Sequence, residues 1–312
     1  MSSSLIVAFD VGGTQIKAAA VVGGAVREDT IGYYESRADL AADDIIARFA
    51  GIFVDTLDKA GPDAAADGLG LAFPGPFDYE AGVSRIRGLG KFDALYGLAV
   101  GELLERELRA NERTKARLAP RFRIVFENDA ALFGLGESAA GGAAESARRA
   151  VCLTIGTGLG SCFLEQGRLV KHREDAPDEG WLYTVPYENG IADDYISRRG
   201  VLALAEELGL DARRLDVREL AGLAESGEEK ARLLFERFGR RMALILTPSL
   251  LKFRPEVVVL GGQISKSAHL FAPAFEAEAA AAGLAANIEV SSDTLLGTLR
   301  GIYSRVNDTY GR

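Results

Sequence analysis

The sequence predicts an α/β protein built from two similar domains. The chain has 312 residues, and a prior of about 150 residues per domain favours two domains, each large enough to bury its own core. Apolar runs typical of buried strands alternate with segments of helical periodicity. A hairpin with a glycine-rich turn occurs twice, once in each half of the chain. Duplication of that hairpin predicts two similar domains that face one cleft, each offering a turn to a shared ligand.

The first half opens with the first of these hairpins. A strand over about Leu5–Phe9 breaks at residues 10–14, and a second apolar run follows directly at 16–22. A strand, a tight glycine turn and a strand make a hairpin, whereas a dinucleotide-binding unit would place a helix after its glycines. Further along we expect, in order, a helix at 39–60, a strand at 69–73, a helix at 95–118, a strand at 123–126 and an alanine-rich helix after Asp129.

The second half repeats the theme. The run over 150–154 is followed by a glycine turn and a second apolar run over 161–164. Later in this half we expect helices at 191–208, 212–225 and 228–247, a buried strand at 256–260 that ends in Gly261-Gly262, and a closing helix from Leu295 to about Val306.

Composition excludes several classes of protein. The chain carries 36 basic and 45 acidic residues, a net charge of −9, so nucleic acid is not an expected partner, because phosphate binding needs a basic face. No apolar run approaches the ~18–20 residues that span a bilayer, and the start has no basic region or cleavage signature. We therefore expect a cytoplasmic protein without a membrane partner. The two cysteines, Cys152 and Cys162, are expected to be reduced core thiols.

The first glycine turn, Asp10-Val-Gly-Gly-Thr14, has the features of a phosphate-binding loop. Glycines at a hairpin tip let backbone N–H groups approach an anion with no side chain in the way. Asp10 can hold a hydrated Mg²⁺, which prefers one or two carboxylates together with phosphate oxygens, and Lys17 is close enough to add positive charge. The alternative is a plain glycine turn in which Asp10 is a turn former.

The second turn, Thr154-Ile-Gly-Thr-Gly-Leu-Gly160, follows the same logic, with glycines and two hydroxyls placed around an anion. Its spacing does not fit the dinucleotide-binding fingerprint, because Ser161 stands where the third glycine is needed. Glu127-Asn128-Asp129 joins the end of a strand to the start of a helix. These residues could simply cap the helix. The functional interpretation makes Asp129 a general base that accepts a proton from an attacking hydroxyl, with Asn128 orienting the same substrate.

Together these motifs resemble the ROK family (repressor, open reading frame, kinase), which has the actin-like ATPase fold. The matching segments, in family order, are residues 9–17, 72–76, 127–130 with 136–137, 154–160 and 259–265. The resemblance implies two actin-like (ribonuclease H-like) ATPase domains flanking a central cleft. They would be an N-terminal small α/β domain of residues 1–126 plus about 296–312, and a C-terminal large α/β domain of residues 127–295. The family's repressors carry an added N-terminal DNA-binding region, which we do not expect because the first phosphate motif begins at residue 10.

The resemblance also implies ATP-dependent phosphorylation of a sugar hydroxyl, glucokinase-like, with Asp129 as the base and Asp10 holding Mg²⁺ through water. It places Gly75, Asn128 and Asp129 at the sugar and Gly261 and Gly262 by the adenosine, and a homodimer is a further expectation by analogy. The phosphate contacts it implies are Asp10, Gly12, Gly13, Thr14 and Lys17 in the first loop and Thr154, Gly156, Thr157, Gly158 and Gly160 in the second.

The sugar side departs from the family pattern. Many members bind a structural zinc through one His and three Cys, but the matching stretch, residues 178–197, has no Cys, and Trp181 stands at the His position. We therefore expect no zinc, with Trp181 and Tyr183 filling the core. Asp178 (or Glu179) and Asp193 stand where two sugar-binding glutamates are usual, and a sugar-contacting Asn is replaced near residues 87–91. The altered pocket argues against glucose as the substrate.

Three other interpretations remain open at this stage. One is a non-catalytic sugar sensor, which the altered pocket favours and the retained Asp129 disfavours. Another is an actin-like structural or chaperone ATPase, although such proteins lack a sugar-facing Asn-Asp pair. The third is polyphosphate as the phosphoryl donor, for which the basic run over 106–123 would be the binding surface. The two histidines, His172 and His269, have no partner at ligand spacing and are expected to be surface or structural residues.

Overall fold

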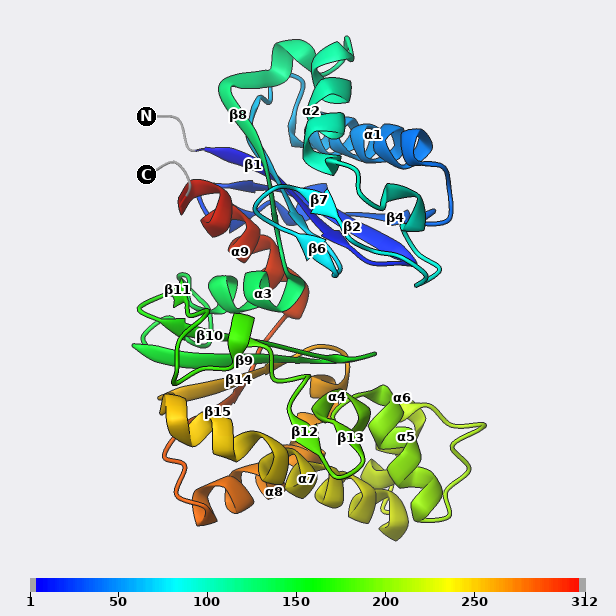
Figure 1. Ribbon diagram of the computed structural model, residues 1–312, viewed down its shortest axis with the longest axis vertical. Coiled ribbons are helices and arrows are strands. Elements are labelled where there is room, and N and C mark those ends of the chain that lie inside the picture. The colour runs from blue at the N-terminus through cyan, green and yellow to red at the C-terminus, as the bar shows by residue number, and fades with distance from the viewer. Residues whose placement is uncertain (1–3, 309–312) are drawn as a thin grey trace. The chain divides into compact units, whose positions relative to one another are not determined.

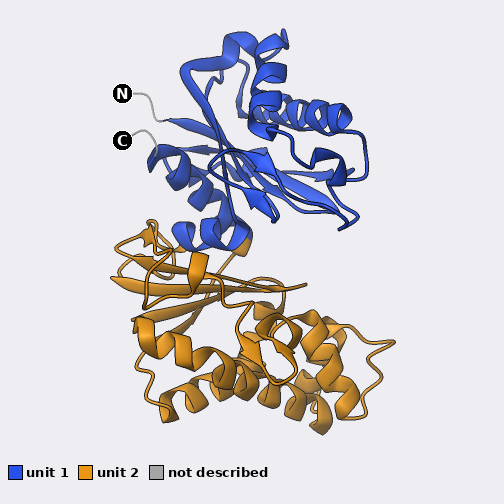
Figure 2. Ribbon diagram, viewed as in Figure 1, with its two compact units in different colours: residues 1–136, 295–312 blue, residues 137–294 orange. Residues whose placement is uncertain are grey.

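The structure is a computed structural model that describes residues 4–308 (Figure 1). The chain forms two compact units (Figure 2). Unit 1 comprises the residues up to Gly136 and those from Leu295 onward, and unit 2 comprises Glu137–Thr294. Each unit has a hydrophobic core of its own, around Phe49 and Phe73 in unit 1 and around Phe235 and Phe238 in unit 2.

Unit 1 is built on one mixed sheet with helices packed against it. Its strand order is β3-β2-β1-β5-β8, and β4 pairs with β2 beside β3. β1 and β2 form the antiparallel hairpin, while β5 and β8 run parallel to β1. The strands are β1 (Leu5–Val11), β2 (Gln15–Val22), β3 (Ala25–Val26), β4 (Gly32–Glu35), β5 (Ala66–Ala72) and β8 (Leu118–Glu127), with a small separate hairpin of β6 (Phe77–Asp78) and β7 (Val83–Ser84). The helices are α1 (Ala42–Ala60), α2 (Val100–Ala110), α3 (Asp129–Glu137) and α9 (Thr294–Asp308).

Unit 2 repeats this topology, with strand order β11-β10-β9-β14-β15. β9 and β10 form the antiparallel hairpin, and β14 and β15 extend the sheet in parallel. The predicted duplication of a glycine-turn hairpin inside an α/β fold is thereby confirmed. The strands are β9 (Arg149–Ile155), β10 (Leu159–Glu165), β11 (Arg168–Leu169), β14 (Val257–Gly261) and β15 (Asn287–Val290), with a separate pair β12 (Pro186–Tyr187) and β13 (Gly190–Ile191). The helices are α4 (Ala192–Tyr195), α5 (Arg198–Glu207), α6 (Val217–Glu225), α7 (Glu229–Phe253) and α8 (Ala268–Ala281).

Several element boundaries differ from the prediction. The helix expected at 95–118 spans only Val100–Ala110; the chain then turns, because the Arg117 guanidinium binds the carbonyls of Leu57, Gly61 and Ala64 instead of lying on a solvated helix face. α7 continues through Pro248 to Phe253, since Leu250 and Phe253 are fully buried and their packing outweighs the missing helix hydrogen bond.

Other elements were divided or missed. The helix expected at 191–208 is split at Ile196–Ser197, where Ser197 caps α5. α8 and β15 were not predicted. α8 is alanine-rich with Pro273 inside it, and β15 is a short edge strand whose residues stay largely exposed, so neither carries a clear amphipathic pattern.

The junction between the units lies at Gly136/Glu137, ten residues beyond the predicted boundary at 126. The reason is that α3 packs against α9 within unit 1: a Cβ added to Gly136 would collide with the Gly297 carbonyl, and one added to Gly301 with the Leu132 carbonyl. Asn128 and Asp129 consequently belong to unit 1, and the units are nearly equal in length rather than small and large. Among the described residues, no helix is both long and apolar enough to cross a membrane.

Candidate active site

Hydrogen-bond register brings the predicted residues of unit 1 to one edge of its sheet. Asp10 of β1 pairs with Ala72 of β5, and Ala72 pairs with Glu127 of β8. These three strands are parallel, so the segments that follow them leave the sheet at the same edge. The glycine turn after Asp10, the Gly75 loop after β5 and Asn128-Asp129 after β8 therefore gather there, which is where ligands bind in open α/β sheets.

The first glycine turn leaves little room for side chains at its tip. The Gly12 N–H donates to the Gln15 carbonyl at 2.9 Å, and a Cβ on Gly12 would lie 2.9 Å from that oxygen. A Cβ on Gly13 would lie 2.9 Å from Cδ of Lys91. The bare backbone of this turn can therefore approach a phosphate closely.

Asp10 and Lys17 stand opposite each other across the hairpin, and the Lys17 ammonium donates to Asp10 Oδ2 at 2.9 Å. In the described part of the chain no group of three or more His, Cys, Asp or Glu side chains is arranged to hold a metal. Hydrated Mg²⁺ needs only one or two carboxylates because water and phosphate oxygens complete its shell. The Asp10 carboxylate, partly exposed beside the turn, fits that requirement.

Asn128 caps the N-terminus of α3. Its Oδ1 accepts hydrogen bonds from the backbone N–H groups of Ala130 (3.0 Å) and Ala131 (3.3 Å). Asp129 Oδ1 accepts from the N–H of Ala130 at 2.9 Å, and the residue is exposed to solvent. The capping alternative thus applies to Asn128, whose amide N–H₂ group remains available as a donor, while the Asp129 carboxylate is not needed as the cap.

The pKa of Asp129 is raised above its ordinary value. The surrounding protein removes part of the hydration of the carboxylate, which disfavours its charged form, and the negative charge of Asp10 raises the pKa further. The N–H of Ala130 and the positive charge of Lys91 act in the opposite direction. A raised pKa makes a carboxylate a stronger base, which suits proton abstraction from a hydroxyl.

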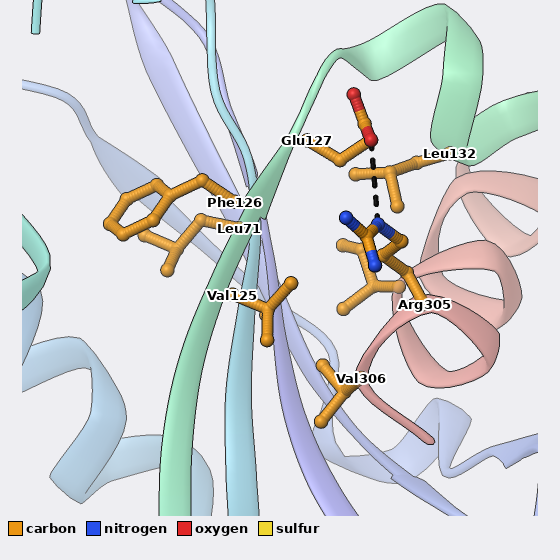
Figure 3. A pocket seen from close by; sticks show the side chains of 9 residues that line it. Leu71, Val125, Phe126, Glu127, Leu132, Arg305 and Val306 are labelled. Atoms are coloured by element: carbon orange, nitrogen blue, oxygen red, sulfur yellow. Dashed lines mark hydrogen bonds and ion pairs between the residues drawn. The ribbon is translucent and has the colours of Figure 1, made fainter. Parts of the chain in front are cut away.

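Glu127 directly precedes Asn128 and Asp129, and its buried carboxylate binds the backbone of Asn128. Its side chain is 3% exposed, its Oε1 accepts from the Asn128 N–H at 3.0 Å, and its Oε2 lies 3.4 Å from Nε of Arg305 on α9. Figure 3 shows the two side chains pointing toward each other beside a gap that Leu71, Val125, Leu132 and Val306 help to line. The gap has no room for a water molecule, whereas ligand pockets begin at ~300 Å³. It separates packed elements and is no substrate site.

The second glycine turn is held within unit 2 by α4 and α5. The Gly156 N–H donates to the Gly158 carbonyl (3.0 Å), and the Arg198 N–H, at the start of α5, donates to the Gly156 carbonyl (2.8 Å). The Leu159 N–H donates to Asp193 Oδ1 of α4 at 2.7 Å. Thr154, Gly156, Thr157, Gly158 and Gly160 thus lie on one hairpin whose turn is anchored from two sides.

Gly261 and Gly262 adjoin this turn. Gly261 pairs with Thr154 in the parallel ladder between β14 and β9. Gly262 has φ +90°, and a Cβ there would lie 2.6 Å from the Ile155 nitrogen. Only glycine combines this backbone conformation with such a close approach. The predicted second phosphate loop and the predicted adenosine-side glycines are therefore neighbours in unit 2.

Asp178, Glu179 and Asp193, the carboxylates predicted to be candidates for sugar binding, all have partners inside unit 2. The ring nitrogens of His172 lie 2.7 Å from Asp178 Oδ1 and 2.9 Å from Glu179 Oε1. Asp193 uses Oδ1 for the Leu159 N–H and Oδ2 for Arg199, at 2.8 Å. His172 is exposed, as expected, but its role in joining two carboxylates was not foreseen, because nothing in sequence spacing signals it.

The stretch expected to hold zinc in other members is organised differently here. Leu182 is fully buried. Trp181 and Tyr183, predicted as core fillers, are both partly exposed, and their rings lie 5.7 Å apart in a tilted arrangement. Tyr183 packs against the hydrophobic core of unit 2, as predicted. Ser161 fastens this stretch to β10 through the Gly180 carbonyl and the Leu182 N–H. The donor set does not fit zinc, since residues 178–197 contain neither Cys nor His and the two cysteines face each other in the β9–β10 ladder.

Most of the basic side chains identified in the run at 106–123 form ion pairs with nearby acidic residues. Arg113 and Arg117 both bind Asp58 of α1 (2.5 and 2.6 Å), and Arg117 also binds backbone carbonyls. Arg109 pairs with Glu105 and Lys115 with Glu112 along the chain. These ion pairs join α1, α2 and the segment that follows α2, so the cations predicted as a polyphosphate surface have partners within unit 1.

The repeated sheet with a glycine-turn hairpin in each unit, and the polar residues gathered at the edge of the first, define an α/β protein of the actin-like ATPase fold. The model of the ROK family matches residues 6–289. The chain belongs to the ROK family, as the motifs indicated.

Known proteins of this family resemble the chain along most of its length. An N-acetyl-D-glucosamine kinase of Photobacterium profundum is 27% identical over 278 residues, covering 82% of this chain and 83% of that protein. A glucokinase of Thermotoga maritima is 26% identical over 254 residues, covering 74% of each. Among solved structures, a glucokinase from Parabacteroides distasonis superposes with a TM-score of 0.79 at 21% identity, covering 98% of both chains. The structural likeness supports the fold.

Proposed function

We propose that this chain is a sugar kinase that transfers the γ-phosphoryl group of ATP to a hydroxyl of a hexose or hexose derivative, with Asp129 as the general base. The observation that carries the proposal is the register of β1, β5 and β8, which gathers the first phosphate loop and Asp129 at one edge. The names of the relatives with 26–27% identity support the class of acceptor, since they are kinases of glucose and of N-acetylglucosamine.

Each part of the site has a task in this reaction. The bare backbone of Gly12 and Gly13 accommodates phosphate oxygens. Asp10 would hold a hydrated Mg²⁺, which would supply positive charge to those oxygens. The Asn128 amide orients the acceptor sugar, and Asp129 takes the proton of the attacking hydroxyl. The carboxylates at 178, 179 and 193 have partners within unit 2, so they offer fewer free acceptors to the hydroxyls of a sugar.

The test is a coupled ADP-release assay with ATP and Mg²⁺ against a panel of hexoses, hexosamines and N-acetylhexosamines. We expect one class of sugar to raise ADP release by orders of magnitude over the sugar-free rate. The same panel is read by thermal shift. A sugar that binds without raising ADP release would contradict the proposal and indicate a sensor.

Asp193 offers a second test, because it is tied to the second phosphate loop. Replacing Asp193 with Ala removes the acceptor of the Leu159 N–H and loosens the turn. We expect the KM for ATP to rise about tenfold, the effect of losing one charge-assisted hydrogen bond, with the KM for the sugar unchanged.

The matched control is Asp194→Ala. Asp194 also binds Arg199, at 3.0 Å, but its other oxygen accepts from the N–H of Ile191 and not from the loop. This variant should retain the wild-type KM for ATP. A rise in the sugar KM of Asp193→Ala, with that for ATP unchanged, would instead assign Asp193 to the sugar.

A further inference from the structure

Lys91 is a cation whose backbone is fixed beside the first phosphate loop. The residue before it, Gly90, donates its N–H to Asp93 at 2.8 Å. The residue after it, Phe92, is fully buried against Phe49 and Phe73, and its N–H donates to the Ala38 carbonyl at 2.7 Å. Lys91 is therefore held between two anchored neighbours, although sequence reasoning noted it only as part of a replaced stretch.

The aliphatic part of Lys91 lies over the glycine turn. A Cβ on Gly13 would lie 2.9, 3.6 and 3.8 Å from Cδ, Cβ and Cγ of this lysine. The absence of a side chain at Gly13 thus makes room for the stem of Lys91. The lysine stem therefore packs directly on the glycine turn.

The charge of Lys91 acts on the reacting edge of the sheet. Its ammonium is close enough to Asp129 to lower the pKa of that carboxylate, against the effect of Asp10. Within residues 4–308 we find no hydrogen bond or ion pair of this ammonium, whereas Lys17, the other cation of the turn, is bound to Asp10. Asp10 and Lys91 are the charged groups that act on Asp129, and since Lys17 is bound to Asp10, Lys91 is the cation placed to meet further negative charge.

We propose that the Lys91 ammonium contacts the phosphoryl group during its transfer and stabilises the negative charge on its oxygens. This inference rests on the proposed function. The sugar oxygen bonds to the γ-phosphorus while its proton passes to Asp129, and the bond to the bridging oxygen of ADP breaks with its electron pair leaving on ADP. Lys91 keeps its proton throughout. Charge on the transferred group is spread over three oxygens, and a fixed cation beside them lowers the barrier.

The experiment compares Lys91→Met, which keeps the aliphatic stem, with Lys91→Arg, which keeps the charge. We expect Lys91→Met to lower kcat about 10²- to 10³-fold, as for loss of one preorganised electrostatic contact, and Lys91→Arg to restore part of it. The acid limb of the profile of kcat/KM against pH should move to higher pH in Lys91→Met, because Asp129 loses a neighbouring positive charge. A purely structural role would leave that limb in place.

A binding measurement decides the question independently of turnover. Calorimetry of Lys91→Met should show affinity for a non-hydrolysable ATP analogue reduced about tenfold, with ADP affinity unchanged. Lys115→Met, which removes a lysine paired with Glu112 on the surface, serves as the control and should match wild type.

Equal losses for both nucleotides, or none, would overturn the assignment, as would a kcat within threefold of wild type. A Lys91→Met variant whose only defect is the KM for the sugar would also overturn it and place the ammonium on the acceptor. If wild-type protein releases no ADP with any sugar, the proposed function fails, and the two nucleotide affinities still decide the role of Lys91.

Discussion

Replacing Asp129 with Asn is expected to lower kcat for sugar-dependent ADP release about 10³-fold, within the range of about 10²–10⁴ contributed by a general base. Asn keeps the size of the side chain and can still accept the N–H of Ala130, while its amide cannot take a proton from a hydroxyl. Since Asn128 caps α3, the helix should persist, and the KM for ATP should change little.

The pH profile provides a second readout of the same residue. A base works only when deprotonated, so wild-type kcat/KM should fall as the pH drops through the pKa of Asp129, at a pH above the ordinary value of about 3.9. Asp10→Asn removes the charge that raises this pKa and should move the acid limb to lower pH in whatever activity remains.

Asp63→Asn, at an exposed loop position, is the control for a carboxylate-to-amide change and should behave as wild type. If Asp129→Asn keeps more than a tenth of the wild-type kcat and its thermal stability is unchanged, Asp129 is not the general base.

The largest expected effect on stability comes from Gly301→Ala. The added methyl group would collide with the Leu132 carbonyl where α9 crosses α3, and the opposing change, Gly136→Ala, would collide with the Gly297 carbonyl. Backbone atoms of a packed helix cannot give way as a flexible side chain can, so the helices must separate. Overpacking costs about 1–3 kcal/mol and sometimes more, and we expect the upper end.

For a unit of this size, a loss of about 3 kcal/mol lowers Tm by roughly 6–12 °C, which differential scanning calorimetry resolves. Gly51→Ala is the matched control, because Gly51 lies inside α1 and nothing is within 4 Å of an added Cβ. It should raise stability slightly, since Ala is preferred over Gly in a helix by about 0.5–1 kcal/mol. Equal melting temperatures for Gly301→Ala and Gly51→Ala would show that α3 and α9 do not need this close contact.

Local patterns were sufficient for much of the fold. Glycine turns between apolar runs identified both hairpins, and helical periodicity identified α1 and α7, because each pattern reflects which side of one element is buried. The same patterns did not predict elements that lack a single buried face, nor the ends of elements that are set by tertiary contacts. Half of the residues of α8 are alanine. α2 ends at Ala110, and the chain turns so that Arg117 binds a carbonyl of α1.

For the candidate site, the sequence by itself determined the chemistry: two glycine turns, an Asp before the first of them, and an Asn-Asp pair at the start of a helix. Residue types and their spacing were enough, since bare backbone binds anions and a carboxylate at the edge of a sheet can serve as a base.

Only the tertiary structure decided how those groups are arranged. Strand register aligned Asp10 with the segments holding Gly75 and Asp129. Asn128 caps α3, so the Asp129 carboxylate is not needed as the cap. The Lys91 stem packs on Gly13, which places this lysine beside the first glycine turn. The carboxylates at 178, 179 and 193 were engaged by His172 and the second turn. These facts depend on contacts between residues far apart in the chain, whose distances no local pattern encodes.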